Sequence, residues 1–236
     1  MPPNYLLACR IDWQAIPPDS YVHQITALRH CAGLEFSQPI TLFAGENGSG
    51  KSTLLTAMAV AFGLPSSGGT QNYASGQEEV VLAKAMRLIK GSQRPPCSYF
   101  FRADQFAALG DAAEAYQSNY GLRPLRQQSH GEGVLAFLQS FQGKGLFFLD
   151  EPEAALSPQR QLTLVLQIME MAAAGAQFFI ASHSPILLGL PQAQIYGFSQ
   201  ETIAPCAYTE TESYQVMELF LNHREALLRR LLQKDQ

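Results

Sequence analysis

The stretch that decides the architecture is Gly45-Glu46-Asn47-Gly48-Ser49-Gly50-Lys51-Ser52. An apolar run before it predicts a strand over 40–44, and the run after it predicts a helix over 51–62. The pattern GxxxxGK[ST] between a strand and a helix is typical of a loop that holds phosphate groups. Its glycines let main-chain N–H groups surround phosphate oxygens, and the positive end of the following helix points to the same place.

The loop predicts both a nucleotide and a metal. Lys51 would place a cation at the β- and γ-phosphates of ATP, and Ser52 would give a hydroxyl ligand to Mg²⁺. The residues that we expect to contact ATP here are Gly45, Glu46, Asn47, Gly48, Ser49, Gly50, Lys51, Ser52 and Thr53.

A pair of carboxylates follows a second apolar run, at 146–149. A strand that is buried on both faces delivers its last residue to the carboxyl edge of a parallel sheet, where ligands of open α/β sheets bind. We therefore predict that Asp150 holds Mg²⁺ and that Glu151 orients the attacking water. For Glu153 we favour support of the next helix start through the helix dipole over a role at the site.

Composition excludes several classes of protein. The 236 residues carry a net charge of −4, which argues against non-specific nucleic-acid binding by bulk charge. The four cysteines have no CxxC spacing, so neither a zinc site nor a disulfide framework is indicated. No apolar run approaches the length of a membrane span, and we expect a cytoplasmic protein.

Strands and helices alternate along the chain, and this predicts an α/β fold with a mainly parallel sheet flanked by helices. Antiparallel strands are expected at the amino end. In the helix at 158–172, the apolar face is expected at Leu162, Val165, Leu166 and Met169. The expected strands are 5–11, 33–36, 40–44, 97–101, 145–149, 177–180 and 195–198, and the expected helices are 51–62, 78–90, 104–117, 158–172 and 213–232.

Further segments follow in a fixed order. Ser129-His130-Gly131-Glu132-Gly133 precedes a predicted helix, Ala154-Ala155-Leu156-Ser157 follows the carboxylates, and Ala181-Ser182-His183-Ser184-Pro185 follows an apolar strand. In this order and spacing the chain resembles an ABC-type ATPase domain. More narrowly, it resembles small stand-alone bacterial predicted AAA-type ATPases, which are related to the ATPase heads of SMC and double-strand-break repair proteins.

The resemblance implies a P-loop NTPase fold in a single domain, 1–236, with a helical subdomain at about 78–141 that carries the signature loop. Ser129 and Gly131 would bind the ATP of a second subunit in a head-to-tail homodimer that forms on ATP. His183 would contact the γ-phosphate, so the implied catalytic residues are Glu151, His183 and Lys51.

Three assignments stay open at this point. Ser129 is also a plausible helix N-cap with Glu132 as its capping-box partner. Ser157, followed by Pro158, is interpreted mainly as an N-cap. Transport ATPases carry a glutamine just after the strand that resembles 97–101, and here Arg102, Asp104 or Gln105 could take that role.

The leading functional hypothesis is an ATP-binding and ATP-hydrolysing switch, with DNA repair or phage defence suggested by family analogy and DNA or a partner protein as candidate partners. The alternative is the ATP-binding subunit of an ABC membrane importer, whose partner would be a membrane permease. His130 and Arg102 depart from the transporter pattern and count against it. A third hypothesis is a nucleotide-dependent interaction module with negligible hydrolysis, against which the Asp150-Glu151 pair argues.

Overall fold

The computed structural model describes residues 4–69, 81–103, 135, 143–154 and 156–233. Its centre is a six-stranded sheet in the order β5-β6-β7-β3-β8-β9, parallel except for the last strand. These strands are β3 (Ile40–Gly45), β5 (Ser98–Arg102), β6 (Gly145–Asp150), β7 (Ala176–Ser182), β8 (Gln194–Phe198) and β9 (Ile203–Pro205). The predicted mixed fold with a mainly parallel sheet is confirmed.

The central strands are buried on both faces, as their continuous apolar sequences predict. Successive side chains point to opposite faces, so Phe148 and Phe179 belong to one core and Phe147 and Phe178 to the other. The rings stack across neighbouring strands, with centroids 5.3 Å apart in the first pair and 5.1 Å apart in the second. The sheet is therefore a rigid platform between two apolar layers.

A smaller antiparallel sheet of β2 (Gly33–Glu35), β1 (Leu6–Ile11) and β4 (Met86–Lys90) confirms the expected antiparallel strands at the amino end. The predicted helix at 78–90 is wrong in its second half. Only α3 (Val81–Lys84) is helical among its described residues, and β4 pairs with β1 from Ile11 opposite Met86 onward. Helix propensity is a weak preference, and the edge of β1 offers main-chain partners that override it.

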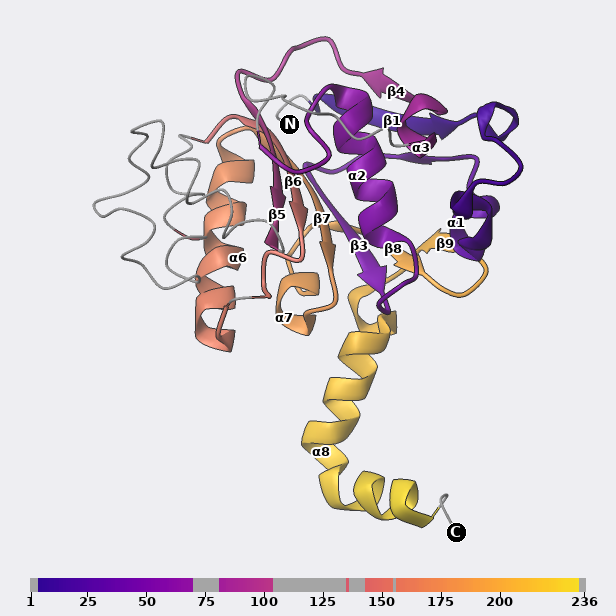
Figure 1. Ribbon diagram of the computed structural model, residues 1–236. Coiled ribbons are helices and arrows are strands. Elements are labelled where there is room, and N and C mark those ends of the chain that lie inside the picture. Colours follow the sequence, from indigo (N-terminus) through magenta and orange to yellow (C-terminus); the bar gives the residue numbers. More distant parts are fainter. Residues whose placement is uncertain (1–3, 70–80, 104–134, 136–142, 155, 234–236) are drawn as a thin grey trace.

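Helices cover both faces of the central sheet (Figure 1). On one face, α2 (Lys51–Phe62) buries Leu54, Leu55 and Met58, and Gly63 ends it in the left-handed conformation. On the other face lies α6 (Pro158–Ala173), which begins at the N-cap Ser157, whose hydroxyl accepts a hydrogen bond from the Arg160 N–H. The N-cap interpretation of Ser157 is confirmed.

The apolar face predicted for α6 is the wrong one. The helix buries Leu164, Ile168 and Met171, whereas Leu162 and Leu166 are 55% and 60% exposed. Apolar residues occur on two sides of this helix, and helical spacing alone does not say which side meets the sheet. Contact with β7 and with α7 (Pro185–Leu188) selects the side that carries Ile168.

The remaining elements lie at the periphery. The 3-10 helices η1 (Trp13–Ala15) and η2 (Tyr21–Gln24) and the short α1 (Thr26–Arg29) connect β1 and β2, and η6 (Tyr208–Glu210) precedes α8 (Glu212–Gln233). α8 projects away from the body, kinks at His223 and buries none of its residues (Figure 1). Among the described helices, none is both long enough and apolar enough to cross a membrane. The predicted helix at 104–117 and most of the predicted helical subdomain lie outside the described residues.

Candidate nucleotide-binding site

The loop 45–50 leaves the carboxyl end of β3 and turns directly into α2. Three of its glycines adopt positive φ, namely Gly45 (151°), Gly48 (82°) and Gly50 (99°). A Cβ on Gly50 would lie 2.6 Å from Ile25 Cγ2, so both the conformation and the space require glycine there. The first N–H groups of α2 have no partner within the helix and face the loop, which makes this turn a cradle for an anion.

Lys51 reaches back under this cradle. Its ammonium donates hydrogen bonds to the main-chain oxygens of Gly45 at 2.8 Å and Glu46 at 2.7 Å, and the residue is only 3% exposed. Burial lowers the pKa of Lys51 from its ordinary value, and the nearby carboxylates of Glu151, Asp150, Glu153 and Glu46 act in the opposite direction. Among the described residues the ammonium has two acceptors for its three donors, and a buried cation of this kind is well suited to phosphate oxygens.

Ser52 and Asp150 meet at the next position. The Ser52 hydroxyl donates a hydrogen bond of 2.8 Å to Asp150 Oδ1, although the two residues lie on different elements. The parallel register explains this contact: Asp150 pairs with Ala181, and Ala44 pairs with Ser182, so β6, β7 and β3 end at the same edge. A hydroxyl beside a carboxylate is a donor set that Mg²⁺ accepts together with phosphate oxygens and water.

Glu151 follows Asp150 in a strained conformation, with φ of 48° in the left-handed region. Its N–H donates to the Ala181 oxygen at 3.0 Å, which fixes the backbone, and its side chain remains about one-third exposed. The Oε1 atom lies 3.9 Å from His183 Nδ1. The residue predicted to orient water and the residue predicted to contact the γ-phosphate thus lie side by side.

Glu153 is the residue whose position the sequence did not reveal. It is 5% exposed, and its Oε1 accepts hydrogen bonds from the Ser182 hydroxyl at 2.5 Å, the His183 N–H at 3.1 Å and the Ser184 N–H at 3.3 Å. The interpretation that it only supports a helix start is wrong, because α6 is capped by Ser157 and Glu153 binds the segment after β7 instead. The serines on either side of His183 are the signal that could have indicated a buried acceptor.

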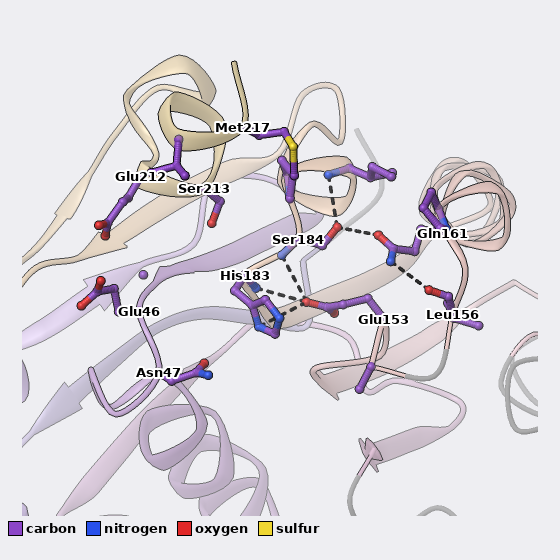
Figure 2. A pocket seen from close by; sticks show the side chains of 16 residues that line it. Glu46, Asn47, Glu153, Leu156, Gln161, His183, Ser184, Glu212, Ser213 and Met217 are labelled. Atoms are coloured by element: carbon purple, nitrogen blue, oxygen red, sulfur yellow. Dashed lines mark hydrogen bonds and ion pairs between the residues drawn. The ribbon is translucent and has the colours of Figure 1, made fainter. Parts of the chain in front are cut away.

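A cleft of about 940 Å³ opens beside these groups (Figure 2). Its floor is formed by the phosphate loop and the segment 183–186, and its far wall by the first turns of α8. Gln161 of α6 links two of its parts, because it accepts a 2.6 Å hydrogen bond from the Ser184 hydroxyl and donates one of 3.0 Å to the Leu156 oxygen. The start of α8 is therefore next to the predicted nucleotide site.

The structure brings most of the predicted site residues together at one sheet edge. Ser49 has its hydroxyl oxygen buried without a hydrogen-bond partner in the described ranges, so the loop holds a polar atom that a bound phosphate could satisfy. Thr53 lies in the first turn of α2. Arg102 ends β5 opposite Asp150 and donates to the Ser66 oxygen at 3.1 Å. Ser129, Gly131, Asp104 and Gln105 lie outside the described residues.

Two family models match consecutive parts of the sequence. One, described as an AAA domain, matches residues 22–102. The other, described as an AAA domain and linked to the AbiEii toxin of a type IV toxin–antitoxin system, matches residues 103–189. Among curated proteins, no significant match was found.

Solved structures share the fold. The SMC head domain from Thermotoga maritima is 14% identical, with a TM-score of 0.51, and the match covers 86% of this chain and 99% of that one. CbiO1 from Clostridium perfringens, part of the ABC transporter complex cbiONQ, is 15% identical, with a TM-score of 0.51 and coverage of 94% and 97%. The two AAA-domain models and the shared fold together support a small ATPase of the AAA/ABC type. Members of these families bind ATP with Mg²⁺, and the cradle, the buried lysine and the Ser52–Asp150 pair described above fit both groups.

Proposed function

We propose that this AAA/ABC-type ATPase hydrolyses ATP with Mg²⁺ and uses the cycle of binding and hydrolysis as a switch. The observation that carries the proposal is the contact between Ser52 and Asp150 beside a buried Lys51, because it joins a phosphate cradle to a metal-binding carboxylate. ATP and Mg²⁺ would supply the γ-phosphoryl group and the charge that neutralises it.

Different residues of the chain would bind the phosphates, hold the metal and position the water. Loop amides at 45–50 and Lys51 hold the phosphates, and Ser52 and Asp150 hold the metal. Glu151 orients water for in-line attack, and its proximity to His183, 3.9 Å away, supports a shared role at the γ-phosphate. Phosphoryl transfer depends mainly on such positioning and charge stabilisation, so no covalent intermediate on the protein is required.

We further propose that ATP closes a head-to-tail homodimer in which Ser129 and Gly131 of one subunit approach the phosphate loop of the other. This step rests on the resemblance of 129–133 to a signature loop. Family analogy suggests phage defence or DNA repair as the setting, and one family model names a toxin of a type IV toxin–antitoxin system. An importer subunit is the alternative, and stable co-purification with a membrane permease would favour it.

The decisive variant is Glu151→Gln, which keeps the side-chain shape but removes the carboxylate. We expect it to bind ATP, to lose hydrolysis by a factor of about 100 or more, and to accumulate as a dimer in size-exclusion chromatography with light scattering. Lys51→Ala is the control that should stay monomeric with ATP.

Equal elution of Glu151→Gln with and without ATP would contradict the dimer switch. ATPase rates of the unmodified protein with and without double-stranded DNA test the nucleic-acid partner. A genuine DNA effect should vanish in Lys51→Ala and weaken steeply with salt.

A further inference from the structure

The carboxylate of Glu153 gathers the segment 182–184 around one oxygen. Three donors from three consecutive residues meet Oε1, namely the Ser182 hydroxyl and the N–H groups of His183 and Ser184. Figure 2 shows the contacts of Glu153 with His183 and Ser184. The Ser182 hydroxyl also accepts a 3.0 Å hydrogen bond from the Ser184 N–H, which closes the arrangement. The turn that presents His183 is therefore shaped around a buried acceptor.

The carboxylate of Glu153 is buried. The Glu153 side chain is 4% exposed, and its Oε2 atom has no hydrogen-bond partner within the described part of the chain. A buried carboxylate is stable only with hydrogen bonds or a cation, and hydrogen bonds to a charged acceptor are about twice as strong as neutral ones. Glu153 follows β6 and lies against the end of β7, the strand that leads to His183. Packing of α6 does not require a buried carboxylate at this place, so the group points to a role at the turn.

The His183 ring lies beside the same carboxylate. Its Nδ1 is 3.8 Å from Glu153 Oε1 and 3.9 Å from Glu151 Oε1. Glu151 is about one-third exposed, whereas Glu153 is buried and held by three donors, so Glu153 is the more firmly placed of the two neighbours of the ring. These distances are too long for hydrogen bonds, but two carboxylates on the same side of the ring favour the proton on Nδ1, which leaves the opposite nitrogen, Nε2, as the acceptor.

We propose that Glu153 is a positioning residue for His183: its hydrogen bonds set the turn that carries the ring, and its charge favours the proton on Nδ1, so that Nε2 faces the γ-phosphate and water. The inference rests on the proposed ATPase function for its kinetic part and on the contacts above for its structural part. Gln161 already anchors Ser184, and the Ser184 hydroxyl caps α7, so the turn has support that does not depend on Glu153. Removing the charge should thus disturb the ring more than the fold.

The kinetic test compares Glu153→Gln with His183→Ala. Glu153→Gln should lower kcat by about 10- to 100-fold, the range known for groups that orient metal-bound histidines, with little change in the KM for ATP. The double variant should fall no further than His183→Ala alone, because both changes remove one function. Glu170 is an exposed carboxylate on α6, so Glu170→Gln is the matched control and should keep the parental kcat.

The second readout needs no catalysis. In ¹⁵N spectra of the histidine side chains, with the His183 signals assigned from His183→Ala, the parental protein should show the form protonated on Nδ1. Glu153→Gln should shift it towards the form protonated on Nε2. Ser182→Ala, which removes one donor and leaves the carboxylate, should give a smaller loss of kcat in the same direction.

Two results would overturn the inference. One is a parental His183 protonated on Nε2. The other is a Glu153→Gln protein in which kcat and the melting temperature fall together and the double variant loses activity additively, as for a purely structural residue. If the parental protein hydrolyses no ATP, the proposed function fails, and the spectra alone still decide the role of Glu153.

Discussion

At the scale of single residues, the phosphate loop depends on glycines whose requirements differ. A Cβ on Gly48 would meet no atom within 4 Å, whereas one on Gly50 would meet Ile25 and Leu28. Both residues have positive φ, which costs a residue with a side chain roughly 1–2 kcal/mol. A side chain at Gly48 would therefore cause backbone strain alone, whereas one at Gly50 would cause both strain and a steric clash.

We predict that Gly48→Ala lowers the free energy of unfolding by about 1 kcal/mol and keeps measurable ATP binding. Gly50→Ala should cost about 2 kcal/mol or more, because strain and collision add, and should abolish ATP binding by displacing the start of α2. Urea unfolding and nucleotide titration of both variants measure this. Equal losses in the two variants would show that the contact between Gly50 and Ile25 has no influence on the loop.

Sequence patterns predicted part of the site because the functional residues there are neighbours in the chain or stand at the end of a recognisable strand. Residues 45–53 are contiguous, and Asp150 and Glu151 end an apolar strand, so a motif and a sheet rule place them together. Glu153 escaped this reasoning because its partners come from the end of β7, and nothing local indicates that its side chain turns back to that strand.

At the scale of elements, α6 shows how a helix with apolar residues on two sides is resolved by its neighbours. Its inner side carries Ile168 in the core beneath the sheet, and its outer side carries Leu166 at 60% exposure. The predicted face was the outer one. β4 is a second example. Its sequence was predicted to be helical, and pairing with β1 makes it a strand instead.

The two sides of α6 can be compared by truncation. Ile168→Ala should lower the free energy of unfolding by about 2–5 kcal/mol, because it removes buried methyl groups and leaves a cavity. Leu166→Ala should change it by no more than about 0.5 kcal/mol, since little buried area is lost. Chemical denaturation measures both changes. A larger loss of unfolding free energy in Leu166→Ala than in Ile168→Ala would show that the face predicted from the sequence is the buried one.

At the scale of the whole molecule, the site exists because three strands that are distant in sequence end together. β6, β7 and β3 are adjacent and parallel, so Asp150, the turn with His183 and the phosphate loop share one edge. Local patterns predict the class of the sheet, but the order of its strands is set by long-range pairing that no single segment encodes. The strand β9 was found only in the structure, as was the position of the start of the predicted C-terminal helix at the rim of the cleft.

The central claim is that the phosphate loop and the end of β6 form one Mg²⁺-dependent ATP site. Calorimetric titration of ATP with and without Mg²⁺ into the parental protein and Ser52→Ala tests it most directly, with Glu170→Gln as control. We predict that Mg²⁺ tightens ATP binding in the parental protein and in the control, and that this gain is lost in Ser52→Ala. Absence of ATP uptake, or an equal Mg²⁺ effect in Ser52→Ala, would contradict the account.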